Sequence, residues 1–154
     1  MGTMSDVIDM RPHHFIDILR GLGAGETFEP SSYGHAVHSV AQALVERPET
    51  VLRLVNRVDA ICAPCIHNVD GTCDDYLQDR NMSKHDFNTA LDARLFGVLE
   101  LAEGTEVPGE EFCGILRASL GDPSKIWTHV SPEEAESRRQ MMLKGIDTFL
   151  GQAS

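Results

Sequence analysis

The sequence predicts a mainly α-helical fold, a single compact domain with a cysteine-rich metal-binding loop and at most a minor β element. Three observations predict it: several segments carry apolar residues at helical spacing, capping residues precede them, and only one segment is rich in β-branched residues. The chain has 154 residues, of which 42% are hydrophobic. This length and apolar content suit one domain with a sizeable core.

The N-terminal part begins with a segment that has no periodicity. We expect residues 1–10 to lie outside the domain, as a disordered tail or a remnant of cloning, because Met4 is a candidate native start. The metal-binding helical domain is then residues 11–154. Its first helix is predicted to begin near Pro12, since proline suits a first helical position, and to end at the glycine-rich stretch 21–25.

The middle of the chain combines one regular helix with two less regular segments. The helix is predicted from the capping residues Ser31 or Ser32 to about Arg47, where apolar residues keep helical spacing. Residues 51–58 are rich in valine and leucine and fit either a short strand or a helical turn. Residues 60–75 have the proline, glycine and asparagine content of a loop, so we expect a metal to hold this segment in place.

Three further helices are predicted in the C-terminal half. Ser83 can cap a helix that ends near Gly104, and Pro108 opens the next one. Ser131 and Glu134 form a capping box ahead of the last helix. The residues of that helix expected to face inward are Ala135, Met142, Ile146, Phe149 and Leu150.

The charge balance excludes several classes of partner. Lys and Arg number 13 against 24 Asp and Glu, and the formal net charge of −11 has the wrong sign for binding nucleic-acid phosphates or an anionic membrane. No apolar run reaches the roughly 18 residues of a membrane span, and the N-terminus lacks the pattern of a signal peptide. The sequence therefore predicts a cytoplasmic protein.

Three of the four cysteines lie in the predicted loop. Two residues separate Cys62 from Cys65, and Cys73 follows after seven more. The first spacing lets two thiolates converge on one ion from a tight turn, as in zinc and iron–sulfur sites. The alternatives are ordinary buried thiols, for which the loop offers little apolar surface, and a redox dithiol, which leaves Cys73 unexplained.

The fourth cysteine, Cys113, lies far along the chain at the start of a predicted helix. The positive end of a helix dipole lowers the pKa of a thiol and supplies N–H donors to a thiolate, so we expect Cys113 to join the other three as a ligand. Its apolar neighbours Phe112 and Ile115 equally fit a core position. His14 and Asp17 are the alternatives for the fourth coordination position.

A pair of histidines at the start of the first helix is the second candidate group. His13 and His14 could bind a metal or perform acid–base chemistry, and Asp17 lies one helical turn after His13, where it could orient that imidazole. We expect these three residues at the rim of the metal pocket, with His14 pointing inward because Ile18 marks the buried side. The alternative is a solvated helix start.

Two motifs carry a family resemblance. The segments Arg11–His14 (RPHH) and Asp59–Cys73 (DAICAPCIHNVDGTC) resemble the domain-of-unknown-function family 1284, small bacterial and archaeal proteins expected to bind an iron–sulfur cluster. The resemblance spans roughly Arg11 to Cys113 and brings no established reaction with it. Members of that family carry a cysteine where this chain has Asp17, and further cysteines after the one that Cys113 matches. Because of this departure, three alternatives stay open for this chain: an intact cluster, a zinc ion in its place, or a metal with an unfilled coordination position.

The leading hypothesis is a metal-binding protein in which Cys62, Cys65, Cys73 and Cys113 hold an iron–sulfur cluster, with [4Fe–4S] favoured over zinc. With three cysteine ligands, an open position beside His13, His14 and Asp17 would suit catalysis on a small-molecule substrate. With four ligands, the centre would be closed. A closed iron–sulfur centre would exchange electrons with a basic redox partner protein. A closed zinc centre would stabilise a structural or protein-interaction module without catalytic activity.

Overall fold

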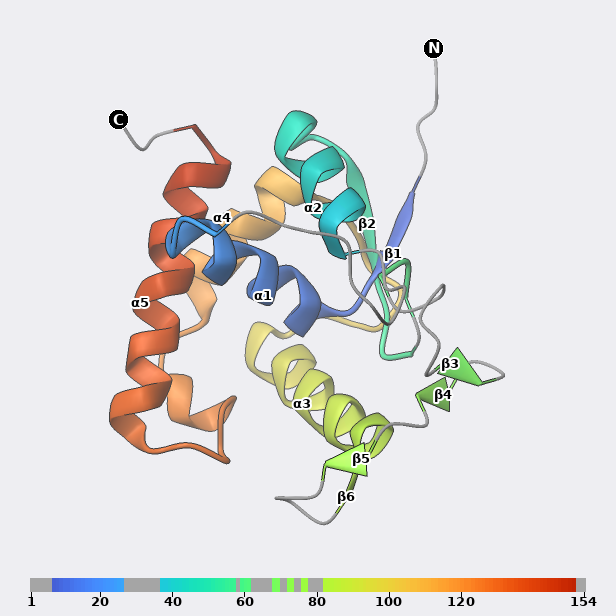
Figure 1. The fold of residues 1–154 in the computed structure, drawn as a ribbon. Helices are drawn as coiled ribbons and strands as arrows, with labels where there is room; N and C mark the ends of the chain where they lie inside the picture. The colour runs from blue at the N-terminus through green and yellow to red at the C-terminus, as the bar shows by residue number, and fades with distance from the viewer. Residues whose placement is uncertain are drawn as a thin grey trace.

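The computed structural model describes residues 7–26, 37–57, 59–61, 68–69, 72–73, 76–77 and 82–151, with residues 37, 68–69, 72–73, 76–77 and 82 described by their backbone alone. These ranges contain five α-helices, which confirms the mainly α-helical prediction (Figure 1). The helices are α1 (Pro12–Gly23), α2 (Val37–Glu46), α3 (Lys84–Leu99), α4 (Gly109–Ser119) and α5 (Pro132–Phe149). The strands are β1 (Ile8–Met10), β2 (Val51–Leu54), β3 (Asn68–Val69), β4 (Thr72–Cys73), β5 (Tyr76–Leu77), β6 (Met82–Ser83) and β7 (Glu106–Pro108), and a short 3₁₀ turn, η2, spans Pro123–Lys125.

A small mixed sheet joins three distant segments in the order β1-β2-β7. β1 runs parallel to β2, with Met10 opposite Leu54, so the connection between them has to cross over and carries α1 and α2. The strand alternative for residues 51–58 is thus the correct one. The exclusion of residues 1–10 is wrong for residues 8–10, because β1 is part of the sheet and Met10 is fully buried.

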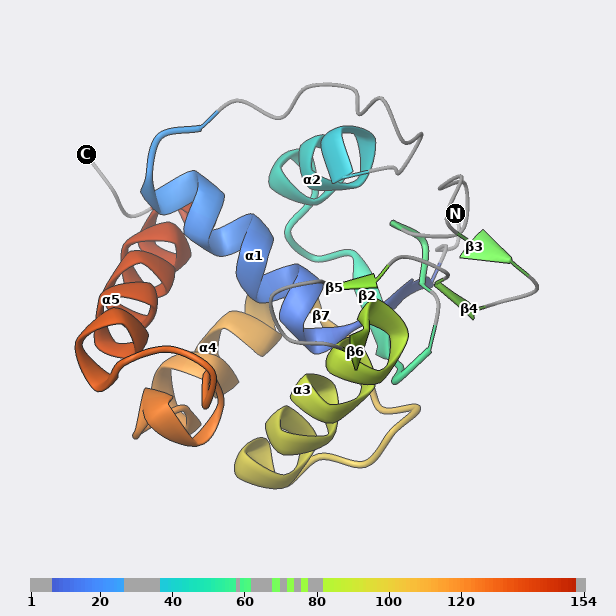
Figure 2. The same ribbon diagram turned by 60° about the horizontal axis from the view of Figure 1, so that its bottom comes forward.

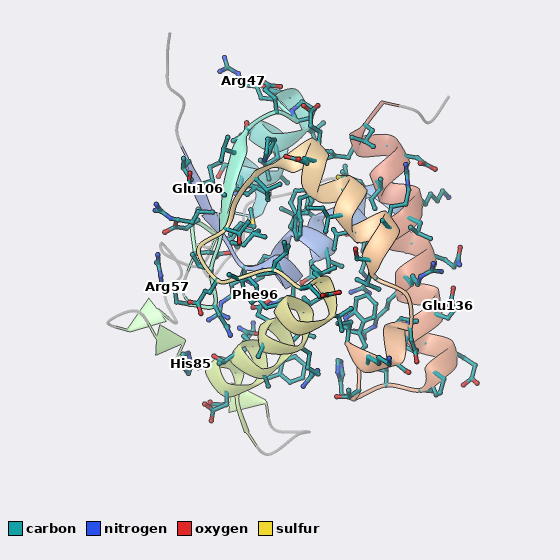
Figure 3. All side chains as sticks on the ribbon, turned by 180° about the vertical axis from the view of Figure 1, so that it is seen from behind. Arg47, Arg57, His85, Phe96, Glu106 and Glu136 are labelled. Carbon is teal, nitrogen blue, oxygen red and sulfur yellow. The ribbon has the colours of Figure 1, made fainter. Side chains whose placement is uncertain are left out.

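The third strand, β7, is absent from the sequence prediction. It pairs antiparallel with β2, and Val107 lies opposite Leu52. Three residues ending in a proline give no alternation to detect, and only the neighbouring strand provides the hydrogen bonds that define it. At the outer surface of the sheet, Arg53 and Arg57 both pair with Asp9, at 2.7 Å and 3.3 Å (Figure 3, where Arg57 and Glu106 are labelled).

Helix α1 lies in the middle of the molecule. Figures 1 and 2 show it with α5 on one side and α3 on another, and its contacts with α5 are the most extensive between any two described elements. A helix covered on several sides needs apolar residues on several faces. Accordingly Phe15, Ile16, Ile18 and Leu19 are all buried, at 1% exposure or less. Phe15 packs against Phe112 and Phe149, with ring centroids 5.3 Å and 5.6 Å away.

Glycines set the closeness of α1 and α5. A Cβ on Gly145 would collide with the carbonyl oxygen of Leu19, and a Cβ on Gly23 would collide with the carbonyl oxygen of Met141. The sequence places the end of the first helix in the stretch 21–25, and the helix ends there, at Gly23. These glycines allow close packing there, which offsets their weak helix propensity.

The predicted helix caps are confirmed where the structure describes them. The Ser83 hydroxyl accepts a hydrogen bond from the Asp86 N–H, and the Ser131 hydroxyl accepts one from Glu134, each at 3.1 Å. On α5, Ala135, Met142, Ile146 and Phe149 face the core as expected, while Leu150 is half-buried. The capping prediction for Ser31 and Ser32 lies outside the described residues.

We predict that Gly145→Ala destabilises the protein by about 3 kcal/mol, because the added methyl group meets backbone, which has no side-chain torsion to relieve the overlap. Gly114→Ala is the matched control. No atom lies within 4 Å of a Cβ added at Gly114, on α4, so alanine should stabilise by about 0.5–1 kcal/mol there. Urea denaturation of both variants measures the difference, and equal stabilities would refute the close packing of α1 and α5.

Candidate functional site

The first turn of α1 is the most polar part of the interior. Arg11 is the N-cap residue, its side chain makes no capping bond, and the first turn contains no acidic residue. The exposed N–H groups of a helix start require acceptors. Asp59 Oδ2 accepts from the Arg11 N–H at 2.7 Å, and Asp92 Oδ1 accepts from the His13 N–H at 2.9 Å. Two carboxylates from distant parts of the chain therefore cap this helix.

Asp92, on α3, is fully buried and binds three groups of the α1 start. Besides the His13 N–H, its Oδ2 accepts hydrogen bonds from Arg11 Nη1 at 2.9 Å and from His13 Nδ1 at 2.8 Å. Burial by itself would raise the pKa of this carboxyl, but the hydrogen bonds from His13 and Arg11 and the proximity of the His13 charge outweigh it, so the pKa of Asp92 is lowered. Asp92 is thus held as a carboxylate.

Asp59 is the corresponding carboxylate for His14. Its Oδ2 lies 2.8 Å from His14 Nδ1, and its Oδ1 accepts from the Ile61 N–H at 3.1 Å. The Asp59 side chain has no exposed surface. The same carboxylate therefore connects Arg11, His14 and the chain at Ile61, the residue directly before Cys62.

Asn56 extends the cluster to the end of β2. Its Oδ1 accepts a hydrogen bond from Arg11 Nη1 at 2.9 Å, and its Nδ2 donates to the Thr89 carbonyl of α3 at 3.1 Å. The guanidinium of Arg11 is therefore shared between a neutral amide and the Asp92 carboxylate. This arrangement fixes the position of Arg11, whose side chain is 3% exposed.

The two imidazoles lie side by side. Their ring centroids are 4.3 Å apart with the planes tilted by 54°, and the side chains of His13 and His14 are 11% and 13% exposed. The alternative of a solvated helix start is therefore wrong for the two histidines. Both histidines are held by buried carboxylates, His13 by Asp92 and His14 by Asp59. The expectation that His14 is the one that faces the metal stays a prediction. In each ring Nδ1 faces a buried carboxylate, and such a contact fixes the orientation of an imidazole.

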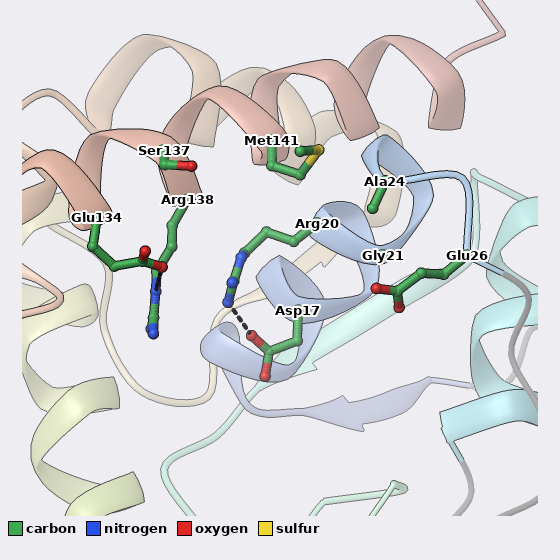
Figure 4. A pocket seen from close by; sticks show the side chains of 9 residues that line it. All are labelled: Asp17, Arg20, Gly21, Ala24, Glu26, Glu134, Ser137, Arg138 and Met141. Atoms are coloured by element: carbon green, nitrogen blue, oxygen red, sulfur yellow. Dashed lines mark hydrogen bonds and ion pairs between the residues drawn. The ribbon is translucent and has the colours of Figure 1, made fainter. Parts of the chain in front are cut away.

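Asp17 has a different environment from the one predicted. It is exposed, pairs with Arg20 at 3.4 Å and lies on a groove of about 440 Å³ between α1 and α5 (Figure 4). In that groove Arg20 and Arg138 each lie 5.9 Å from the ring centroid of Trp127. The prediction that Asp17 orients His13 is wrong, since Asp92 occupies that position.

Cys113 lies in the hydrophobic core. It is the fifth residue of α4 and is fully buried. Burial raises the pKa of its thiol to about 12; Glu110 adds to the increase, and the opposing charge of Arg117 is too weak to reverse it. The predicted lowering of this pKa is therefore wrong, because the helix dipole acts mainly within the first turn. Its role as a metal ligand stays a prediction.

The other cysteines lie largely outside the described residues. Nothing is described for Cys62 and Cys65, and Cys73 is described by its backbone, in β4. β4 pairs antiparallel with β3, which places Cys73 opposite Asn68, and β4 lies against α3. Among the described side chains, no group of three or more histidine, cysteine or acidic residues has a metal-binding arrangement.

Comparison of the chain with protein-family models, curated proteins and solved structures gives no match. The resemblance to family 1284 therefore rests on the segments Arg11–His14 and Asp59–Cys73 alone and stays a prediction. None of the helices in the described ranges has both the length and the apolar character needed to cross a membrane.

Sequence reasoning identified the two histidines but missed both of their partners. Asp92 is flanked on α3 by Leu91 and Leu95, and all three are at least 96% buried. A carboxylate on the apolar face of a helix is the signal that could have identified it, because buried acids need partners. Asp59 gave a weaker signal, its position directly before the cysteine-rich segment.

We predict that Asp92→Asn destabilises the protein by about 3 kcal/mol, because it leaves the buried Arg11 charge without its carboxylate. Asp17→Asn is the control. It removes an exposed pair and should change stability by less than about 0.5 kcal/mol. Urea denaturation near neutral pH provides both values.

The lowered pKa of Asp92 also predicts a pH dependence. A carboxyl whose pKa lies below its unfolded value of 3.8 stabilises the fold above that pH, and this contribution is lost as the pH falls through the folded value. Denaturation curves from about pH 6 down to about pH 2.5 should therefore show a steeper loss for the wild type than for Asp92→Asn. Parallel curves would contradict the assignment.

Proposed function

We propose that this protein is a metal-binding protein whose centre is held by Cys62, Cys65 and Cys73, with a [4Fe–4S] cluster as the favoured group. The observation that carries the proposal is the hydrogen bonding of Asp59, which joins His14 to the chain one residue before Cys62. The last described residue before Cys62 is thus bonded to the same carboxylate that orients His14.

The backbone of the cysteine-rich segment gives further support. Pairing of β3 with β4 sets Cys73 opposite Asn68, which follows Cys65 by three positions in the sequence. Directly paired residues of two antiparallel strands have Cα atoms about 4.5–5.5 Å apart. The hairpin therefore sets Cys73 opposite a residue that follows Cys65 by only three positions, which supports a centre that the two cysteines share.

The cost of the polar cluster also favours a functional role. Two carboxylates, a guanidinium and two imidazoles occupy positions that an apolar core could fill with equal or better stability, since burying ions carries a large desolvation cost. Histidines that bind metals typically donate the other ring N–H to a carboxylate. The described residues thus fit a metal centre in their donor chemistry.

The chemistry such a centre would provide depends on its coordination. Iron–sulfur clusters bound by thiolates exchange electrons, and an open iron position acts as a Lewis acid toward a small-molecule substrate. The chain's own contribution is to hold His13 and His14 with their Nδ1 atoms fixed and to shield them from solvent. The net charge of −11 would favour a basic partner protein.

Anaerobic purification of the full chain, followed by iron, sulfide and zinc analysis, tests the proposal. We expect brown protein with iron and sulfide in equal amounts, and loss of most of the bound iron in Cys65→Ser. Colourless protein with stoichiometric zinc would replace the cluster by zinc. Wild-type protein prepared in this way with neither metal would refute the proposed function.

The same variant should also lose stability, because metal binding to a loop contributes directly to the free energy of folding. We expect Cys65→Ser to lower the Tm by roughly 10 °C, which corresponds to about 3–4 kcal/mol for a domain of this size. Thermal unfolding of both proteins under anaerobic conditions measures the shift. An unchanged Tm together with an unchanged metal content would contradict a metal at Cys65.

A further inference from the structure

We propose that the groove between α1 and α5 is a binding site for a small linear zwitterion of the ω-amino-acid class, a molecule with a carboxylate at one end and an ammonium group at the other. The groove has a volume of about 440 Å³, and two arginines and three acids line it (Figure 4). This volume is typical of small-molecule sites. The lining contains none of the cysteines and histidines of the proposed metal centre, so binding here is independent of a metal.

The two helices line the groove with similar ion pairs. α1 contributes Asp17 and Arg20, and α5 contributes Glu134 and Arg138. In each pair the acid lies about one helical turn before the arginine, at 3.4 Å for Asp17 and 3.1 Å for Glu134. The two acidic side chains are 53% and 51% exposed, so solvent weakens both pairs. Each arginine can therefore exchange its acid for a better acceptor.

Trp127 brings the two guanidinium groups to one place. Each lies 5.9 Å from the centroid of its ring, a distance at which a cation is attracted to an aromatic face. Trp127 is 3% exposed, and its N–H donates to the Pro123 carbonyl at 3.0 Å, so the ring is a fixed platform. Two like charges near one ring repel each other. An anionic group that accepts from both arginines removes this repulsion.

Arg20 has hydrogen-bonding capacity left for a ligand. A guanidinium has five N–H donors. Among the described residues Arg20 has one acceptor, Asp17, at 3.4 Å, and its Nε is buried without a hydrogen-bond partner. A buried donor without an acceptor costs free energy, which a ligand can recover. A planar carboxylate suits this position because it accepts two parallel N–H bonds from one guanidinium.

Glu26 supplies the opposite charge. Figure 4 shows the two arginine side chains toward one end of the groove and Glu26 at the other. After α1 the chain turns at Gly25, whose φ is 74°, and the Glu26 N–H donates to the Gly21 carbonyl at 2.9 Å. Glu26 has no ion pair among the described residues. Its carboxylate is therefore available to an ammonium group.

The balance of charges selects a zwitterion over a simple ion. The lining has three acids against two arginines, so a ligand with negative charge alone meets a surplus of negative charge. A ligand with positive charge alone meets the two arginines. The apolar side chains of Ala24 and Met141 also line the groove and suit a methylene chain between two charged ends.

Trp127 is the single tryptophan of the chain, so its fluorescence reports binding in the groove. The probes are ω-amino acids of increasing length, from glycine to ε-aminocaproate, added to the full-length protein in a low-salt buffer near neutral pH. We expect saturable binding with a Kd of about 0.1–1 mM at a preferred length that reaches both charged ends. The simple acid and the simple amine of that length should bind about tenfold more weakly, since each lacks one charged contact.

Isothermal titration calorimetry of variants locates the site. Arg20→Gln and Glu26→Gln should each weaken binding of the preferred probe by about tenfold, because each removes a charge-assisted hydrogen bond. Arg47→Gln is the matched control, since Arg47 is exposed directly after α2, outside the groove, and this variant should bind like the wild type. Circular dichroism checks that Arg20→Gln is folded. Glu26 is exposed, so Glu26→Gln tests the site without disturbing the core.

The possible results lead to distinct conclusions. A preferred probe length, together with weaker binding in both groove variants, supports the zwitterion site. Equal binding of the simple acid and the ω-amino acid overturns it and makes the groove an anion site. Equal losses in Arg47→Gln and Arg20→Gln overturn it as well, because binding then follows net charge and not this groove. The absence of saturable binding for every probe overturns it outright.

Discussion

Two buried carboxylates, on Asp59 and Asp92, hold the first turn of α1. This helix contributes no acid to its own start, so its exposed N–H groups depend on acceptors from the segment after β2 and from the middle of α3. The direction of α1 follows from where these two carboxylates lie. Glycines let α5 pack closely along α1, so the position of the C-terminal helix depends on the same contacts. Arg11 makes the burial of both acids tolerable by donating to each of them.

The interactions that fix α1 also orient the histidines. A carboxylate that accepts from a helix N–H and from an imidazole Nδ1 serves both purposes at once, and this double use explains why so many polar groups are buried together. Stability by itself does not require them, because an apolar core of the same volume would avoid the cost of desolvation. The cluster also lies where the chain enters the cysteine-rich segment, through the bond from the Ile61 N–H to Asp59. The Asp59 carboxylate therefore contributes both to the structure of α1 and to the proposed chemistry.

The coordination number of the proposed centre would separate a catalyst from an electron carrier. Three cysteines with an open position would suit a catalyst, whereas a fourth protein ligand would suit an electron carrier. Among the described residues, His14 is oriented by the Asp59 carboxylate, whereas Cys113 is fully buried in the core beside α4. The net charge of −11 would favour a basic partner over an acidic one.

The sequence by itself determined the helices of the C-terminal half and the caps at Ser83 and Ser131, because periodicity and capping are interactions within a few residues. It also singled out His13 and His14. It did not determine the strands β1 and β7, the burial of Cys113 or the two carboxylates beside the histidines. Those features depend on partners far along the chain, and the bonds from His14 to Asp59 and from Arg11 to Asp92 span 45 and 81 residues. An acid between two leucines shows in the sequence that a partner is needed. Only the packing of α1 against α3 decides which residue is the partner of that acid, because hydrogen bonds and burial depend on distances in space that no local pattern encodes.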